Sequence, residues 1–267
     1  EYPRCDGTVR AYLFQPEKPT HHVMVCAHGG GNDALFPLVQ VFSTIISNGW
    51  SIFTFDIDGH GRNSTSQLIP DQVRDCFGAA VAHCRALLPQ CEVHLLGHSF
   101  GGLLALDLAL QNTSPAVKSC TIITTPIDIA HVDQTVVRFE TKAIFKVSVR
   151  NMLRHYGIID AMPAYKDFKR DIYPVRLKAA ERRHYIPILG TVFREVALST
   201  RLAQMQVATY LICAERDAIA PIGPIRAAAG QNERVRVIEV PRETHITLPF
   251  SGALLTELQA IVSFVMT

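Results

Sequence analysis

Short apolar runs alternate along the chain with longer segments in which apolar residues recur at helical spacing. The short runs are rich in Val, Ile and Phe and alternate only weakly with polar residues, as strands covered on both faces do. They predict strands at Thr8–Phe14, His22–Ala27, Trp50–Phe55, Glu92–Leu96, Val117–Thr124, Ala208–Cys213 and Arg234–Val240. The longer segments predict helices over residues 35–48, 70–88, 101–112, 222–230 and 249–266.

The order of these elements predicts an α/β protein. Strands that alternate with helices form a mostly parallel central sheet with helices on both faces. One interval does not fit, because residues 127–205 contain no strong strand signal and are far longer than a crossover requires. We therefore interpret residues 127–205 as an inserted, mainly helical cap, and residues 1–126 and 206–267 as the core.

Composition agrees with a single α/β domain. A chain of 267 residues, 48% of them hydrophobic and 19% charged, can bury one large core. The net charge of +2 is unevenly distributed, because the predicted cap holds 14 Lys and Arg against 8 Asp and Glu. Five of these basic residues recur at intervals of four: Arg138, Lys142, Lys146, Arg150 and Arg154. On a helix, this basic stripe suits weak contact with an anionic membrane surface, an anionic acyl substrate, or simply solvent.

The seven cysteines do not follow the pattern of a disulfide framework or a metal site. Cys26, Cys120 and Cys213 lie inside predicted buried strands, and no C-x-x-C pair occurs. We expect a reduced, cytoplasmic setting, with a disulfide through Cys5 or Cys91 as the alternative. No run of 18 uncharged apolar residues predicts a membrane span. The chain does not begin with Met, so a missing N-terminal segment with a signal peptide stays open.

The segment around Ser99 carries the strongest chemical signal. A predicted strand ends at Gly97-His98-Ser99-Phe100-Gly101, and a predicted helix follows at once. A G-x-S-x-G sequence between a strand and a helix is the context of a nucleophile elbow. Glycines two residues to either side of the serine leave room for a strained turn that lifts its hydroxyl above the sheet. The amide of Phe100, at the start of the helix, would then face a developing oxyanion.

Together with this motif, three further segments make the chain resemble the α/β-hydrolase superfamily, in its branch of monoacylglycerol-lipase-like and serine-aminopeptidase-like esterases. The first is His28-Gly29-Gly30-Gly31 after a predicted strand, where the resemblance implies that Gly30 supplies a second oxyanion amide. The second, residues 56–64, is similar to the family's D-x-x-G-x-G-x-S loop. We interpret that loop as structural, which makes His60 a poor candidate for the catalytic base.

The third segment follows the predicted strand that ends at Cys213. It resembles the family's G-x-x-D-x-x-x-P pattern, with Ala214 in place of glycine, and so implies that Asp217 is the catalytic acid. Glu215 remains an alternative acid, and Asp217 could instead cap the helix that follows.

His245 is the best candidate for the base, because it lies between the last predicted strand and the last helix. This position completes the chain order Ser, Asp, His expected of the fold. His98, next to the nucleophile, is expected to point away from the site. The histidines of the predicted cap can line a pocket, and they are His131, His155 and His184.

Ser99, Asp217 and His245 then predict a serine hydrolase that cleaves carboxylic esters of small to medium acyl chains through an acyl-enzyme. Gly30 and Phe100 are the predicted oxyanion donors, and the substrate-binding residues are expected within the predicted cap. We expect a small-molecule ester or acyl substrate, no nucleic-acid partner, and no metal or organic cofactor. The alternatives are a thioesterase or acyltransferase that uses an anionic acyl carrier, and a non-catalytic binding protein on the same fold.

Overall fold

The structure is a computed structural model that describes residues 1–5, 7–61, 63, 69–111, 117–128 and 179–265. A central sheet of seven strands is present in this part of the chain, in the order β3-β5-β4-β6-β7-β8-β9. Its strands are β3 (Ala11–Phe14), β4 (His22–Ala27), β5 (Ser51–Phe55), β6 (Glu92–His98), β7 (Val117–Ile123), β8 (Ala208–Ala214) and β9 (Val235–Val240). Strand β3 is antiparallel to β5, and the other pairings are parallel. The expected mostly parallel sheet is confirmed.

The first predicted strand, Thr8–Phe14, is divided in two. Its beginning belongs to β2 (Gly7–Val9), which pairs antiparallel with β1 (Tyr2–Arg4) in a separate two-stranded sheet. A strand as short as β1 shows no alternation in sequence, so it was not predicted. Nε of Arg4 lies 2.9 Å from a carboxylate oxygen of buried Asp58, and this ion pair attaches the hairpin to the loop after β5.

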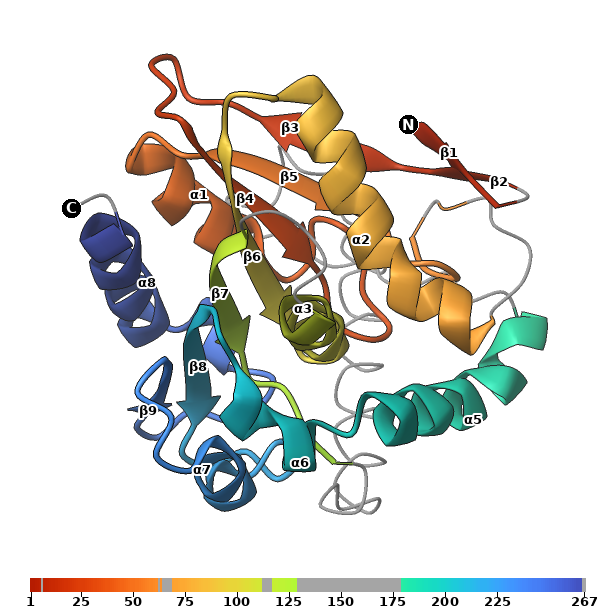
Figure 1. Cartoon of the computed structure of the whole chain (residues 1–267), viewed down its shortest axis with the longest axis vertical. Helices are drawn as coiled ribbons and strands as arrows, with labels where there is room; N and C mark the ends of the chain where they lie inside the picture. The colour runs from red at the N-terminus through yellow and green to blue at the C-terminus, as the bar shows by residue number, and fades with distance from the viewer. Residues whose placement is uncertain (6, 62, 64–68, 112–116, 129–178, 266–267) are drawn as a thin grey trace, which may run out of the picture.

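Helices cover both faces of the sheet, as expected (Figure 1). On one face, α1 (Val39–Ser47) and α8 (Gly252–Val265) bury Ile45 and Leu258 in a shared apolar cluster. The opposite face is covered by α2 (Pro70–Leu87), α3 (Phe100–Gln111) and α7 (Ile222–Ala229). Helix α1 begins four residues later than predicted, because the Asp33 carboxylate accepts two amides, those of residues 35 and 36, and folds them into a turn.

Of the predicted cap, the structure describes residues 127–128 and the last part, residues 179–205. These last residues form α5 (Ala179–Val196), α6 (Leu198–Arg201) and the short 3₁₀ helix η3 (Leu202–Gln204), in keeping with a mainly helical segment. Val192 and Leu202 are buried in the same apolar cluster as α3. The basic stripe lies outside the described residues, and the division of the chain into core and cap stays a prediction.

A buried carboxylate connects α6 to helices α2 and α3. Asp107 of α3 is 1% exposed, and its oxygens lie 3.1 Å from a guanidinium nitrogen of Arg74 and 3.4 Å from one of Arg201. Arg74 belongs to α2 and Arg201 to α6, so three helices meet at one buried charge. Because a buried carboxylate is stable only when it is paired, this cluster holds α6 on α3.

The thiols of the cysteines and the apolar character of the helices can be compared with the cellular setting that the sequence predicts. All seven cysteines carry free thiols, including Cys5 and Cys91, so the alternative of a disulfide through either residue is not realised. Cys26, Cys120 and Cys213 are buried in strands, as predicted. Among the helices that the structure describes, none combines the length and the apolar character needed to cross a membrane.

Candidate active site

Ser99 occupies the sharp turn between β6 and α3, at the carboxyl edge of the sheet. Its φ angle of 51° lies in the left-handed region, which residues other than glycine rarely adopt. Hydrogen bonds of the Ser99 amide and carbonyl hold this backbone in place. The Ser99 amide donates to the carbonyl of Ile123 at 3.0 Å, and the Ser99 carbonyl accepts the hydroxyl of Thr125 at 2.9 Å. Neither bond uses the Ser99 side chain, which is half-buried.

The glycines of the motif have no space for a side chain. A Cβ atom on Gly97 would lie 2.4 Å from the Cα atom of Gly102, and one on Gly101 would lie 2.4 Å from the carbonyl oxygens of Ala27 and His28. Because these neighbours are backbone atoms of α3 and of the end of β4, they cannot rotate away as the end of a flexible side chain could. The glycines therefore do more than clear the serine: they let the helix and the neighbouring strand pack against the turn.

Three predicted site residues form one hydrogen-bonded chain at this edge. Oγ of Ser99 lies 2.9 Å from Nε2 of His245, and Nδ1 of His245 lies 2.8 Å from Oδ2 of Asp217. Asp217 follows β8 and His245 follows β9, and both side chains are buried. Strands β6, β7, β8 and β9 are consecutive and parallel in the sheet, so the loops after their carboxyl ends come together.

The Asp217 carboxylate is surrounded by hydrogen-bond donors. Oδ1 accepts the amides of Ile219 at 2.8 Å and Ala220 at 2.7 Å, while Oδ2 accepts the Thr124 hydroxyl and faces His245. Burial alone raises the pKa of Asp217, but the hydrogen bonds from His245, Thr124 and Ala220 outweigh it and bring the pKa below its usual value. The carboxylate is therefore ionised at neutral pH. It can keep the proton of His245 on Nδ1, which leaves the lone pair of Nε2 directed at Ser99.

Thr124 is a member of this cluster that the sequence interpretation missed. It follows β7 with a φ angle of 47°, and its amide donates to the carbonyl of Ile212 on β8 at 2.8 Å. Its hydroxyl donates to Asp217 and lies 3.4 Å from Nδ1 of His245. The available signal was a pair of threonines at the carboxyl end of a predicted strand, where side chains of a parallel sheet meet a site.

We expect Thr124→Val to lower kcat about 10- to 100-fold and to leave KM nearly unchanged, because a hydrogen bond to a charged group contributes roughly 1.5–3 kcal/mol. Thr124→Ser keeps the hydroxyl and should retain activity. Thr121→Val is the matched control, since Thr121 is a buried threonine of β7 whose hydroxyl has no hydrogen-bond partner among the described residues. Steady-state kinetics of the three variants measure the effect. Equal rates for Thr124→Val and Thr121→Val would show that the Thr124 hydroxyl has no role in the reaction.

The two candidate acids, Asp217 and Glu215, differ in their position and contacts. Glu215 is exposed, and its carboxylate accepts the amide of Arg242 at 2.6 Å, on the surface. Asp217 does accept nearby amides, but these belong to the turn before α7, which begins only at Ile222. The contact with His245 is therefore made by Asp217.

The neighbouring histidines have other partners. Nδ1 of His28 lies 2.7 Å from the carbonyl oxygen of Gly29, and its Nε2 accepts the amide of Ile57 at 3.0 Å. Nδ1 of His60 lies 3.1 Å from the carbonyl oxygen of Asp58. Burial lowers the pKa of His28 to about 4 and that of His60 to about 3, so both rings are neutral. These contacts agree with a structural role for the loop at residues 56–64.

His98 differs from its expected orientation. Its ring is buried and lies 5.9 Å, centroid to centroid, from the ring of His245, so it packs beside the candidate base instead of pointing away. A Cβ atom on Gly29 would lie 2.7 Å from Nδ1 of His98, which explains why the turn after β4 needs glycine at that position. Burial, followed by the proximity of His245, lowers the pKa of His98 to about 3.

The predicted oxyanion donors lie at the same edge of the sheet. Ala27, near the end of β4, is paired in register with Gly97 of β6, so the turns that contain Gly30 and Phe100 are neighbours. Gly30 is exposed and Phe100 is the first residue of α3. The positive end of the α3 dipole favours negative charge near Ser99. Hydrogen bonding of these two amides to an oxyanion stays a prediction.

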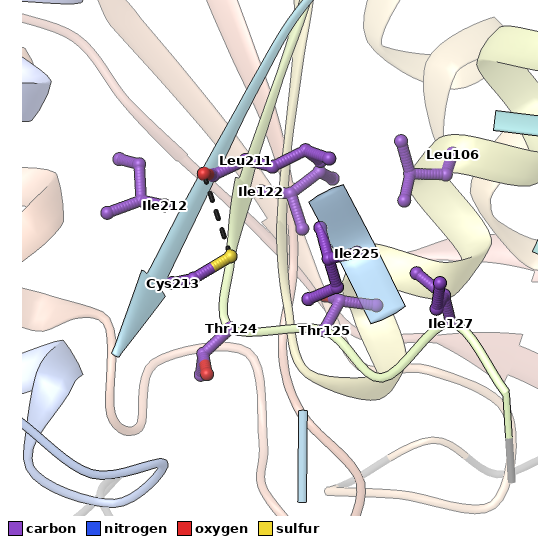
Figure 2. A pocket seen from close by; sticks show the side chains of 9 residues that line it. All are labelled: Leu106, Ile122, Thr124, Thr125, Ile127, Leu211, Ile212, Cys213 and Ile225. Carbon is purple, nitrogen blue, oxygen red and sulfur yellow. Dashed lines mark hydrogen bonds between the residues drawn. The ribbon is translucent and has the colours of Figure 1, made fainter. Parts of the chain in front are cut away.

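A small apolar pocket lies beside this site (Figure 2). It is lined by Thr124, Thr125 and Ile127 together with apolar side chains from β7, β8, α3 and α7. Its enclosed space is about that of a single water molecule, which is too small for an acyl group. Most of the cap residues predicted to select the substrate lie outside the described residues.

Part of the chain is similar in sequence to known methylesterases. Protein phosphatase methylesterase 1 of Schizosaccharomyces pombe is 27% identical over 124 residues, which cover 44% of this chain and 36% of that protein. The methylesterase of the same name from Bos taurus is 32% identical over 114 residues, covering 41% of this chain and 29% of that protein. The matches therefore span well under half the length of these curated relatives.

Solved structures are similar over nearly the whole chain. The monoacylglycerol lipase of Paleococcus ferrophilus has a TM-score of 0.62 at 13% identity, and the match covers 97% of this chain and 98% of that one. The thioesterase domain from the curacin biosynthetic pathway has a TM-score of 0.64 at 17% identity, covering 100% and 98%. The family model of the alpha/beta hydrolase family matches residues 24–253, well over half of the chain. The chain belongs to the alpha/beta hydrolase family.

Proposed function

We propose that this protein is a serine hydrolase that cleaves carboxylic esters of small to medium acyl chains. One observation carries the proposal: the hydrogen-bonded path from the Ser99 hydroxyl through His245 to the ionised Asp217 carboxylate. A serine hydroxyl is a weak nucleophile unless a neighbouring base takes its proton during attack. Here Nε2 of His245 lies at hydrogen-bond distance from that hydroxyl, and Asp217 stabilises the imidazolium that forms.

The reaction proceeds in two halves. Oγ of Ser99 attacks the acyl carbonyl while Nε2 of His245 accepts its proton, and the amides of Gly30 and Phe100 bind the oxyanion. The tetrahedral intermediate then expels the alcohol, which takes the proton from His245 and leaves the acyl group on Ser99. Water attacks this acyl-enzyme, gives a proton to His245 and releases the carboxylic acid. The proton returns to Oγ, so the enzyme is restored.

The names of similar proteins support acyl-ester chemistry. They include methylesterases, a lipase and a thioesterase domain. All of these names describe hydrolysis at an acyl carbon, with leaving groups that range from methanol to a thiol. Because a thioesterase domain is among the similar structures, thioester hydrolysis is the second candidate reaction.

A fluorophosphonate probe tests the nucleophile directly. We expect one adduct in the folded protein, mapped by mass spectrometry to Ser99, and none after heat denaturation, because only the assembled site activates the serine. Folded protein that carries no adduct on Ser99 would instead favour a non-catalytic binding protein.

A substrate panel tests the acyl group and the leaving group. It should contain p-nitrophenyl esters of increasing acyl length, a methyl ester and matching acyl thioesters. We expect the highest kcat/KM for the short and medium p-nitrophenyl esters. Faster cleavage of thioesters at the same acyl length, after correction for their intrinsic reactivity, would assign the enzyme to the thioesterases.

A further inference from the structure

A second cluster of polar side chains lies at the edge of the sheet opposite Ser99. It consists of His22 at the start of β4, and of Glu92 and His94 at the start of β6. One donor atom from each residue lies within 4.8 Å of the donor atoms of the other two. Register explains the meeting, because His22 is paired with Glu92 across the two parallel strands. Ser99 follows the far end of β6, about 20 Å away at the usual rise of a strand.

The distances within this cluster match those between ligands of one metal ion. Nδ1 of His22 lies 3.1 Å from Nε2 of His94 and 3.6 Å from Oε2 of Glu92. Around a tetrahedral Zn²⁺ ion with bonds of about 2.0–2.2 Å to nitrogen and oxygen, neighbouring ligand atoms are about 3.4 Å apart. Two of the three separations are therefore close to those around an ion, and the third is within 4.8 Å.

Outer partners hold two of the three side chains in the orientation that binding requires. Nδ1 of His94 lies 2.8 Å from the hydroxyl of Ser119 on β7, which leaves Nε2 directed at the cluster. The Lys118 ammonium lies 2.9 Å from Oε1 of Glu92, which leaves Oε2 on the side of His22. Contacts on the far side of a ligand fix its orientation.

The aromatic surroundings fix the rings as well. Trp50 stacks on His22 with ring centroids 4.7 Å apart and an angle of 19° between the planes. The ring centroid of Trp50 also lies 4.3 Å from that of His94. Both imidazoles are buried, whereas the Glu92 side chain is 38% exposed. A cation can therefore reach the cluster from solvent along Glu92, and water can complete its coordination on that side.

We propose that His22, Glu92 and His94 bind a divalent transition-metal ion, with Zn²⁺ as the best fit to two imidazoles and one carboxylate. Magnesium and calcium prefer sites built from oxygen ligands, so this donor set disfavours them. The ion joins β4 to β6 directly and to β7 through Ser119. It stabilises the fold because it binds the assembled cluster, which the unfolded chain lacks. This role is independent of the proposed ester hydrolysis.

Metal-stripped protein titrated with Zn²⁺ tests the proposal. Isothermal titration calorimetry should show binding of one equivalent, and Tm should rise by about 5 °C when free Zn²⁺ exceeds Kd a hundredfold. Glu92→Gln is the decisive variant, because its partly exposed side chain can change without disturbing the core. We expect it to weaken Zn²⁺ binding about a hundredfold and to remove most of the rise in Tm.

Two further variants sharpen the result. His94→Gln should lose the response in the same way. His83→Gln is the matched control, because His83 is a half-buried histidine of α2 that stacks on Tyr2 outside the cluster, and it should respond as wild type does. The proposal is overturned if wild type binds no equivalent of Zn²⁺, or if Glu92→Gln keeps the wild-type response. A thiolate-to-metal band in the Co²⁺ spectrum would assign the binding to a cysteine and would equally overturn it.

Discussion

Replacing Ser99 with alanine should lower kcat for a p-nitrophenyl ester by about 10⁴- to 10⁶-fold. The substitution removes only the Oγ atom, which lies 2.9 Å from Nε2 of His245. The bonds that hold the turn use the Ser99 amide and carbonyl, so the backbone should keep its conformation. The remaining rate would come from substrate binding and the oxyanion amides alone. Initial rates at saturating ester measure the loss.

Ser43→Ala is the matched control for this prediction. Ser43 is an exposed serine of α1, outside the candidate site, and its loss should change kcat less than twofold. Thermal unfolding should show that Ser99→Ala and Ser43→Ala are both folded. A folded Ser99→Ala variant with the wild-type rate would mean that another residue is the nucleophile.

Asp217→Asn should lower kcat about 10⁴-fold while leaving the fold intact. The reason lies in the donors around the carboxylate. Oδ1 accepts two backbone amides, from Ile219 and Ala220, so the oxygen of an asparagine must take that place. Its NH₂ group then faces Nδ1 of His245 and donates to it. The proton of the imidazole is forced onto Nε2, which can no longer accept the proton of Ser99.

Glu215→Gln provides the comparison for Asp217→Asn. It makes the same chemical change two residues away, at an exposed carboxylate bonded to the amide of Arg242, and it should alter kcat less than twofold. Kinetics of the two variants at the same pH decide between the acids. A larger loss in Glu215→Gln than in Asp217→Asn would reassign the role to Glu215.

The same carboxylate also links stability to pH. Hydrogen bonding keeps the pKa of Asp217 in the folded protein below the value of about 3.9 expected for an unfolded chain. Its contribution is therefore fully present above the unfolded pKa and is lost as the pH falls through the folded pKa. Urea unfolding should show that wild type loses free energy of unfolding in this acid range. Asp217→Asn, which has no carboxylate to titrate there, should lose less.

The sheet, its two helical layers and the position of Ser99 could be predicted because each depends on local pattern. Strands covered on both faces produce the short apolar runs, and the glycines around Ser99 mark a turn that tolerates no side chains. Chain order and family resemblance were enough to select Asp217 and His245 from many acids and histidines.

The parts that could not be predicted depend on contacts between distant segments. Thr124 reaches Asp217 across 93 positions of sequence, only because β7 and β8 are paired in one register. The ring of His98 lies 5.9 Å from that of His245, which follows β9 and is far away in sequence. Similarly, His22 and Glu92 meet through the pairing of β4 with β6. Long connections, not short turns, join these parallel strands, so no local pattern in the sequence marks which residues will lie opposite one another.

The buried Asp107 cluster has a consequence for engineering. Its pairing with Arg201 fixes α6 on α3, while Thr125 and Ile127, where the chain leaves β7, are also buried in the core. The chain is thus attached to the core on both sides of residues 129–178. We expect that residues 129–178 can be replaced by a segment from another family member without moving the contact between Ser99 and His245. Loss of the Asp107–Arg201 contact should make such a replacement less well tolerated, because α6 would lose its ion pair with α3.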